Sequence, residues 1–478
     1  MSITSERKPG QWASWAIWQR GGAAYRAIIA NAGSLVGATA VTSVLGFVYW
    51  WVAARQYSTG EVGLASAAIS AMTLLGTVGM LGLGTLLIGE LPQRRGAEGP
   101  LIATASIVTA VTGGVLGVGF ALIAPWLSPD FRPLGASVGA VMLFAVGAAL
   151  TALTLVLDQA LIGMMRGGLQ LARNFVFSAA KLTALGVFAF WSARTFGLAI
   201  YATWTIGNAL SLGALAGVAL LRRVPLHRTR PDWALLRDFR RAALGHHGLN
   251  LSLQFSHLML PLIVTVTLSA AVNAYFYAAW MIAGFVFTLP LALTVVLYAV
   301  GAADPAALAR KTRFTLGIAA VSGLLTNAVL WVAAPLVLRL FGTAYATYAS
   351  TPLRVLTLGV FALIIKDHYV AACRIQSRVL AASARIFAGG CLELAGAAGG
   401  AVLGGLTGLT LGWLAAVVVE AVLMAPAVVR IAAPFGLHRW RLPAEDAAAA
   451  SVATLAVPAA LTDASGSPSL PSLPAGNP

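Results

Sequence analysis

The sequence predicts an all-α polytopic membrane protein with about twelve transmembrane helices, arranged as two pseudo-symmetric six-helix lobes around a central cavity. Of its 478 residues, 59% are hydrophobic and only 10% are charged, which does not match a soluble enzyme. The apolar residues form twelve stretches, each long enough to cross a hydrocarbon core of about 30 Å as a helix and too long for barrel strands. Lysine and arginine gather in alternate connections between these stretches, as the positive-inside rule requires.

The predicted spans cover residues 28–53, 62–88, 101–124, 134–157, 175–191, 197–221, 246–269, 273–299, 314–338, 352–373, 386–404 and 407–429. Residues 1–27 form a predicted cytosolic interfacial segment, 28–221 the first lobe and 246–430 the second. Between the lobes, residues 222–245 carry Pro231 followed by Trp233, Leu236 and Phe239 at helical spacing, with arginines opposite. This pattern predicts an amphipathic cytosolic linker helix. Residues 431–478 are rich in Ala, Pro and Ser and predict a largely disordered cytosolic tail.

Charge placement predicts the orientation. With a cytosolic N-terminus and alternating spans, 24 of the 31 Lys and Arg residues lie on the cytosolic side and five on the outer side. We therefore expect a multi-pass protein of the inner (plasma) membrane with both termini cytosolic. The net charge of +16 follows from this bias, so it does not call for a nucleic-acid partner.

The sequence contains no pattern typical of a catalytic site, so we do not expect an enzyme. The connections are too short for a soluble catalytic domain, and we find neither a phosphate-binding glycine loop nor a nucleophile–base arrangement. No cysteine and histidine cluster has metal-ligand spacing, so we expect no metal site and no cofactor. The two cysteines, Cys373 and Cys391, lie in or near spans and are expected to be reduced packing residues. At the start of the second span, Ser58 and Glu61 have the spacing of a capping box.

Charged side chains inside the membrane recur at one spacing. Lys181 and Glu393 lie 212 residues apart, and Asp158 and Asp367 lie 209 apart, which indicates a parallel repeat of the two lobes. The predicted buried charge network comprises Asp158, Lys181, Lys366, Asp367, Glu393 and Glu420. Asp158 and Lys181 lie at equal depth on neighbouring helices and are expected to pair, and so are the residues at equal depth in the second lobe. Three interpretations remain open: structural pairs, a proton- or cation-coupling site, and a direct substrate contact.

A polar stripe marks the predicted span 246–269. Its members recur at helical spacing and precede Pro261, so they face either a cavity or other helices. In the first span, Arg55 is either a snorkelling residue or an anion contact at the outer mouth of the cleft. Aromatic residues after position 274 either stack on sugars or only pack. The predicted cavity residues are Asn31, Arg55, His247, Asn250, Gln254, His257 and Tyr277.

Four stretches resemble a known family: GFVYWWVAARQYSTGEVGLASAAISAMTLLGTVGMLGLGTLLI, LDQALIGMMRGGLQLARNFVFSAAKL, NAYFYAAWMIAGF and KDHYVAACRIQSR. They are similar to bacterial polysaccharide-export proteins of the multidrug/oligosaccharidyl-lipid/polysaccharide exporter superfamily. The resemblance implies a V-shaped pair of lobes that works by alternating access. It also implies a flippase that moves polyprenyl-pyrophosphate-linked oligosaccharide across the inner membrane for cell-envelope or exopolysaccharide biosynthesis.

The partners expected from this resemblance are the lipid-linked oligosaccharide, membrane lipids, and the polysaccharide polymerase or glycosyltransferases of the same pathway. Two alternatives stay open. One is a drug/cation antiporter of the same superfamily, which would expel cationic dyes. The other is a membrane-embedded glycan polymerase, which would need catalytic groups in long outer loops.

Overall fold

The computed structural model describes residues 42–94, 98–190, 198–222, 230–303, 308–376 and 378–433. Within these ranges every regular element is helical, and ten helices are long and apolar enough to cross a membrane. The predicted fold class is therefore confirmed. The first span is described only as the helix at 42–56, so Asn31 and the interfacial segment 1–27 lie outside the described residues, as does the tail beyond residue 433.

After the helix at 42–56, the elements follow one another as an almost unbroken series of helices. In order they are α2 Thr59–Gly79, α3 Leu83–Glu90, η1 Leu91–Gln93, α4 Glu98–Leu127, η2 Pro129–Phe131, α5 Arg132–Gly135, α6 Val138–Gly163, α7 Gly167–Phe190, α8 Ala199–Leu221, α9 Ala234–Thr267, α10 Ala270–Ala303, α11 Leu308–Arg339, α12 Thr343–Ile375 and α13 Val379–Ala432.

The 54 residues of α13 form two crossings. A straight helix of that length would be about 80 Å long, far more than a bilayer core. The helical dihedrals break at Gly404 and Gly405, the latter with φ of 58°, and the two arms fold back together. A Cβ atom on Gly400 would collide with the carbonyl oxygen of Gly408 on the other arm. Counted with the helix at 42–56, this gives the twelve predicted crossings.

The second predicted span, 62–88, is broken in the structure. Ser58 caps α2 and forms the predicted capping box with Glu61. The helix then ends at Gly79, and Leu81 and Gly82 adopt left-handed dihedrals with φ of 49° and 78° before α3 begins. Hydrophobic periodicity continues across this break, so the sequence pattern alone does not reveal it.

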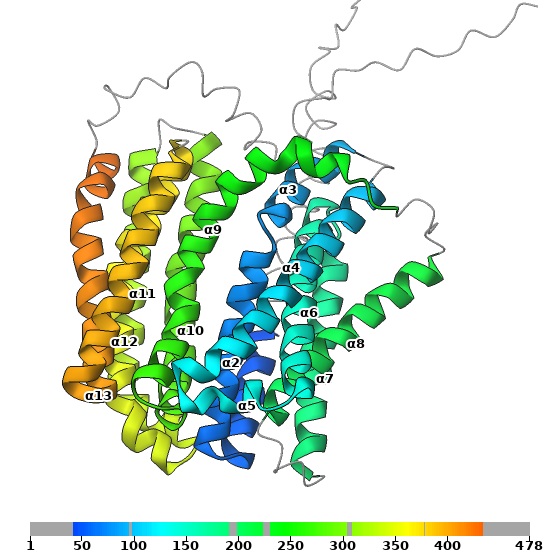
Figure 1. Ribbon diagram of the computed structural model, residues 1–478. Helices are drawn as coiled ribbons and strands as arrows, with labels where there is room; N and C mark the ends of the chain where they lie inside the picture. The colour runs from blue at the N-terminus through cyan, green and yellow to red at the C-terminus, as the bar shows by residue number, and fades with distance from the viewer. Residues whose placement is uncertain are drawn as a thin grey trace, which may run out of the picture.

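The predicted linker helix and the seventh span form one continuous helix, α9, which begins at Ala234, shortly after Pro231. In Figure 1 this green helix runs along the top of the bundle and then turns down between the lobes. Its entry is fixed by Thr104 of α4, whose hydroxyl accepts a hydrogen bond of 2.9 Å from the backbone N–H of Asp232. The linker is thus continuous with a helix that lies at the lobe boundary.

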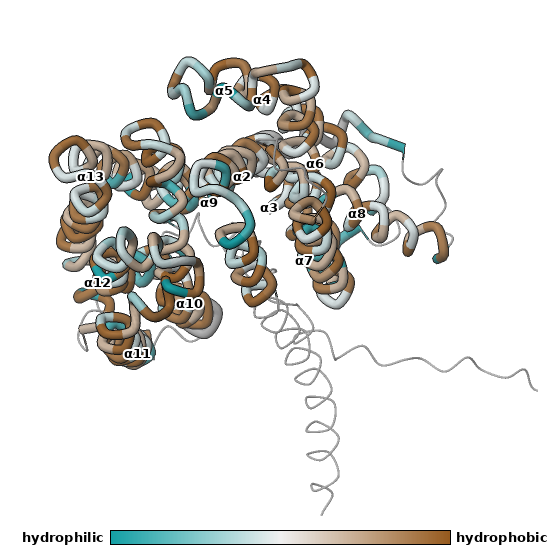
Figure 2. The backbone as a smooth tube through the Cα atoms, turned by 90° about the horizontal axis from the view of Figure 1, so that it is seen from below, coloured by the Kyte–Doolittle hydropathy of each residue, from teal (hydrophilic) through white to brown (hydrophobic). Residues whose placement is uncertain are grey.

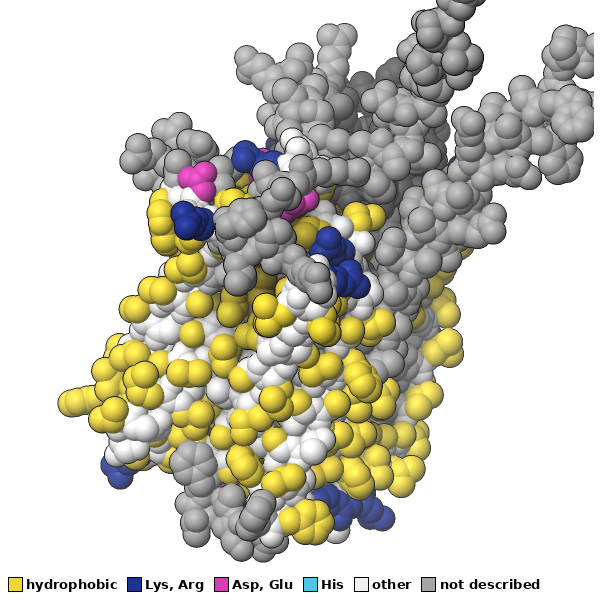
Figure 3. All heavy atoms as spheres, turned by 90° about the vertical axis from the view of Figure 1, so that its right-hand side faces the viewer, with side chains coloured by type: hydrophobic (Ala, Val, Ile, Leu, Met, Phe, Trp, Pro, Cys, Tyr) yellow, Lys and Arg dark blue, Asp and Glu magenta, His cyan; other side chains and the backbone are white. Residues whose placement is uncertain are grey.

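Two groups of helices are visible when the bundle is viewed along its length (Figure 2): α9 to α13 on one side, and α2, α3, α6, α7 and α8 on the other. Between the two ends of the bundle, the lipid-facing surface is mostly apolar, and Lys and Arg gather at the ends (Figure 3). Because lipid offers no hydrogen bonds, such a surface requires backbone groups satisfied within helices, as they are here. We call the end where α2 and α10 begin the outer end, following the orientation that the charge pattern predicts.

Candidate functional site

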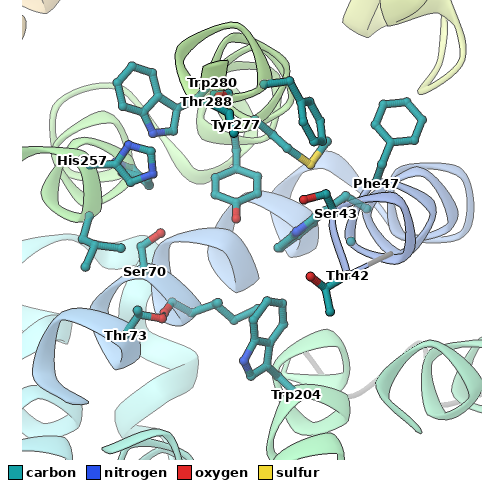
Figure 4. A pocket seen from close by; sticks show the side chains of 18 of the residues that line it. Thr42, Ser43, Phe47, Ser70, Thr73, Trp204, His257, Tyr277, Trp280 and Thr288 are labelled. Atoms are coloured by element: carbon teal, nitrogen blue, oxygen red, sulfur yellow. Dashed lines mark hydrogen bonds between the residues drawn. The ribbon is translucent and has the colours of Figure 1, made fainter. Parts of the chain in front are cut away.

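A cavity of about 400 Å³ lies between the two lobes. Residues of the helix at 42–56, α2, α7 and α8 line it from the first lobe, and residues of α9 and α10 line it from the second. Figure 4 shows polar side chains, among them Ser43, Ser70 and Thr73, interleaved with the aromatic rings of Trp204, Tyr277 and Trp280. Such a mixture of apolar walls and a few convergent polar groups is typical of a ligand site.

Two of the predicted cavity residues lie on its wall. His257 of α9 packs its imidazole against Trp280, with the ring centroids 4.9 Å apart. Tyr277 of α10 packs against Trp50 of the first lobe at 4.6 Å, and its hydroxyl points toward the centre of the cavity (Figure 4). The Trp50–Tyr277 contact joins the lobes on the outer side of the cavity, since both residues lie within about two turns of the outer ends of their helices.

The other members of the α9 stripe have separate environments. Gln254 lies one turn from His257 toward the inner end of α9, and it is exposed. Asn250 donates a hydrogen bond of 3.2 Å to the hydroxyl of Thr85 on α3, so it joins the lobes at the inner end, as the interhelical interpretation predicts. His247 is buried. None of these three is among the residues that line the described cavity.

Arg55 lies at the outer end of the helix at 42–56, where its side chain is exposed. Its guanidinium lies at the outer end, away from the cavity wall, and its Nε donates to the carbonyl oxygen of Leu340 at 2.7 Å. One Nη donates to the carbonyl oxygen of Arg339 at 3.2 Å. These carbonyls end α11 of the opposite lobe. Backbone acceptors therefore hold the side chain, a contact that no sequence pattern indicates.

Lys181 of α7 lies on the cavity wall, although the sequence placed it in the buried charge network and not among the predicted cavity residues. Its Nζ atom is 3.7 Å from the ring centroid of Trp204, 4.6 Å from that of Phe177 and 5.0 Å from that of Tyr49. The residue is only 4% exposed, and no carboxylate of the described chain forms an ion pair with it. Aromatic faces stabilise a desolvated ammonium group by cation–π attraction but do not neutralise it.

Asp158 pairs with Arg173 rather than with Lys181, which corrects the predicted pairing. Two parallel hydrogen bonds of 2.6 and 2.8 Å join the guanidinium to the carboxylate, and Arg173 also contacts Asn174 and Ser211. Arg173 lies in the second turn of α7, and its side chain is buried. Because this side chain is long and fork-shaped, it takes the carboxylate in a bidentate pair, which leaves Lys181 at the cavity.

The second lobe holds a buried cluster of one lysine and two glutamates, which we call the acidic triad: Lys366, Glu393 and Glu420. The Lys366 ammonium lies 2.5 Å from Glu393 Oε1 and 2.9 Å from Glu420 Oε2. Glu393 also accepts hydrogen bonds from Ser256 at 2.8 Å and Trp413 at 2.9 Å. The triad therefore has two carboxylates for one cation within the membrane-spanning part.

Asp367 does not join the acidic triad, although the sequence argument placed it there. It follows Lys366 on α12, and adjacent helical residues point about 100° apart. The contact with Lys366 is made instead by Glu420, which lies on the second arm of α13. Trp413, which donates to Glu393 of the triad, packs edge-on against Trp280 of the cavity wall with the ring centroids 5.2 Å apart, so one ring separates the two sites. Among the described residues, no group of three His, Cys, Asp or Glu side chains could hold a metal ion.

Comparison with known proteins identifies the fold. No protein-family model matches the chain, and no curated protein matches it. An inward-facing multidrug resistance MATE family transporter of the MOP superfamily superposes with a TM-score of 0.62 at 17% identity, over 83% of this chain and 96% of that one. An outward-facing transporter of that description gives 0.56 at 18% identity, over 85% and 95%.

A third solved structure is a MOP superfamily transporter from Pyrococcus furiosus. It superposes with a TM-score of 0.57 at 18% identity, over 85% of this chain and 96% of that one, and the reverse polarity of its binding pocket has been taken to suggest a different function. At these identities the likeness is one of fold. The chain has the two-lobed fold of MATE family transporters.

Proposed function

We propose that this protein is an alternating-access exporter that moves polyprenyl-pyrophosphate-linked oligosaccharide across the inner membrane, for cell-envelope or exopolysaccharide biosynthesis. The fold of MOP superfamily transporters and a cavity lined by both lobes support the exporter. The chemistry of the cavity wall supports the class of substrate.

The single observation that carries the proposal is Lys181. Among the described residues that line the cavity, it is the one lysine or arginine, and no carboxylate lines the cavity with it. A buried cation without a counter-ion is costly in a membrane, and an incoming phosphate oxygen would supply a charge-assisted hydrogen bond stronger than the aromatic contacts. The polarity of the cavity therefore favours an anionic substrate.

The aromatic residues suit the sugar part of such a substrate. Trp50, Trp204, Tyr277 and Trp280 line the same cavity as Lys181, and flat apolar rings with polar edges offer both stacking faces and hydrogen bonds. Ser70 and Thr73 add hydroxyl groups on the α2 wall (Figure 4). The rings also pack against each other, as in the contact of Trp280 with His257, so stacking on a sugar and packing are compatible.

A drug/cation antiporter is the second candidate. The solved structures with this fold include multidrug resistance transporters, and the acidic triad contains one more carboxylate than cation. A lipophilic cation in the described cavity would, however, meet Lys181 and no described acid. The two candidates therefore predict opposite effects when the charge of Lys181 is removed.

The test is a pair of transport assays on purified protein in proteoliposomes. Lys181→Met should lower transport of a polyprenyl-pyrophosphate-linked oligosaccharide by roughly 10- to 100-fold, the equivalent of one lost charge-assisted hydrogen bond. Lys181→Arg, which keeps the charge, should retain most of the activity. Arg313→Met removes an exposed positive charge from α11 and serves as the matched control.

Efflux of a lipophilic dye cation by the same vesicles distinguishes the antiporter. If Lys181→Met transports the sugar lipid at the parental rate, the anionic substrate is wrong. If the parent expels the dye and Lys181→Met expels it faster, the antiporter replaces the flippase.

A further inference from the structure

The outer end of the cavity is covered by a contact between the first span and the end of α11. Trp51 Nε1 donates to the carbonyl oxygen of Leu340 at 2.8 Å, and Arg55 Nε donates to the same oxygen at 2.7 Å. Arg55 also reaches the carbonyl oxygen of Arg339. Trp51 and Arg55 lie one turn apart on the helix at 42–56, so a single face of the first lobe caps a helix end of the second.

The end of α11 provides the acceptors. The last carbonyl groups of a helix lack intrahelical partners and carry the negative end of its dipole. The tight turn after α11 uses several of them, since the carbonyl groups of Val337, Leu338 and Arg339 accept from the N–H groups of Leu340, Phe341 and Gly342. The carbonyl of Leu340 is the next one along the chain, and it receives its two donors from the opposite lobe.

Aromatic contacts continue this seam toward the cavity. Phe47 meets Phe341 edge-on with centroids 5.2 Å apart, and both Phe47 and Trp50 line the cavity. The hydrogen bonds of Trp51 and Arg55 therefore lie directly outside the rings that close the cavity at this end. Separation of the lobes at this end would have to break these hydrogen bonds.

A second seam at the outer end has a different construction. Asn273 of α10 donates to the carbonyl oxygen of Gly63 at 2.9 Å and to the hydroxyl of Ser66 at 3.0 Å, and all three residues are buried. Opening this seam would expose the buried backbone where α2 and α10 contact each other. Trp51 and Arg55 are exposed, so water can replace their hydrogen bonds when they separate, and each bond favours the closed state by only roughly two- to tenfold.

We infer that Trp51 and Arg55 form an outer latch: by capping the C-terminal end of α11, they hold the cavity closed to the outside, and their release is part of opening it. The latch is a conformational device of this chain, and its two acceptors are the carbonyl groups of Arg339 and Leu340. It rests on the alternating access of the proposed function but does not depend on the substrate.

The chain offers a matched control for Arg55. Arg354 of α12 is half-buried, and its Nε donates a solvent-exposed hydrogen bond to a carbonyl oxygen of α11, that of Trp331, at 2.8 Å. The chemistry is the same, an arginine on a helix carbonyl, but both partners belong to the second lobe. Removal of Arg354 deletes an equivalent bond without touching the boundary between the lobes.

The experiment measures how fast a cysteine on the cavity wall reacts with a membrane-impermeant maleimide added from outside. The reporter is Thr73→Cys, on the α2 wall (Figure 4), in a protein whose Cys373 and Cys391 are replaced by alanine. Arg55→Gln should raise the labelling rate by at least about fivefold, because two bonds that favour the closed state are lost. Arg354→Gln should label at the parental rate.

Trp51→Phe is the second variant, since it keeps an aromatic ring and removes one donor. It should give a smaller rise, and it keeps the test informative if Arg55→Gln accumulates poorly in the membrane. Labelling after denaturation normalises each rate to the amount of protein. If both variants label at the parental rate, or if Arg354→Gln rises as much as Arg55→Gln, the latch is wrong. Because no substrate is present, this outcome is independent of the flippase assays.

Discussion

Replacement of Lys366 by methionine should be among the most damaging single substitutions in the second lobe. Its ammonium is shared by Glu393 and Glu420, so its loss leaves two carboxylates without a cation. Glu393 retains the donors of Ser256 and Trp413. Among the described residues, Glu420 retains none.

The expected loss of stability follows from these contacts. Removal of one partner of a buried ion pair costs about 3–5 kcal/mol. At about 2 °C per kcal/mol, the midpoint of thermal unfolding should fall by roughly 6–10 °C for Lys366→Met. Glu420→Gln leaves Lys366 and Glu393 as a neutral pair and should cost only about 0–1 kcal/mol. Glu393→Gln disturbs three donors and should cost about 2–3 kcal/mol.

Thermal unfolding of purified protein in detergent, followed by tryptophan fluorescence, measures how the three variants rank in stability. The reasoning is refuted if Glu420→Gln is as unstable as Lys366→Met, or if Lys366→Met melts with the parent. Because Glu420→Gln is expected to fold, it also tests coupling. If the surplus carboxylate takes up a proton during transport, this variant should lose the response of transport to a pH gradient while its melting temperature stays unchanged.

Three further predictions follow from single contacts. Cysteine at position 59 (Thr59→Cys) should react with an impermeant reagent from outside, as the predicted orientation requires; labelling only after the membrane is opened would invert the topology. Gly63→Ala should abolish accumulation of folded protein, measured by size-exclusion chromatography, because its Cβ would overlap the carbonyl oxygen of Ala270. Asp158→Asn should destabilise the first lobe by about 3–5 kcal/mol by stranding Arg173, and Asp158→Asn with Arg173→Met should recover most of the lost melting temperature; no recovery would contradict the pairing.

Hydrophobicity was sufficient to predict the helical fold, because a bilayer leaves few alternatives to long apolar helices. The turn at Gly404 and Gly405 lies where the sequence separates the predicted spans 386–404 and 407–429. The break at Leu81 was not predicted, since it depends on backbone dihedrals at one or two residues. The apolar pattern is unchanged across such a point. Continuity of the linker with α9 was missed for a related reason: the charged linker and the apolar span differ in composition but not in helical propensity.

Site residues were predictable by type and depth but not by partner. The stripe on α9 drew attention to His257, and the structure places this residue on the cavity wall. Depth arguments placed Asp158 and Lys181 together, yet a long arginine one hairpin turn away competes better for the carboxylate. Which of two cations reaches an acid depends on side-chain length and rotation about the helix axis, and sequence spacing fixes neither.

The repeat places charged residues at equivalent positions of the two lobes, but their contacts differ. In each lobe a tryptophan of the last span packs on the charged residue of the preceding span: Trp204 on Lys181 and Trp413 on Glu393. The sign of the charge selects the contact, since a cation sits over the ring face and a carboxylate accepts from the indole N–H. The first lobe thereby presents an uncompensated cation to the cavity, and the second keeps an excess acid one ring behind its wall. An anionic substrate that engages Lys181 would neutralise a charge on the first-lobe side of the cavity. A proton taken up by the triad would neutralise a charge on the other side, behind the contact of Trp280 with Trp413.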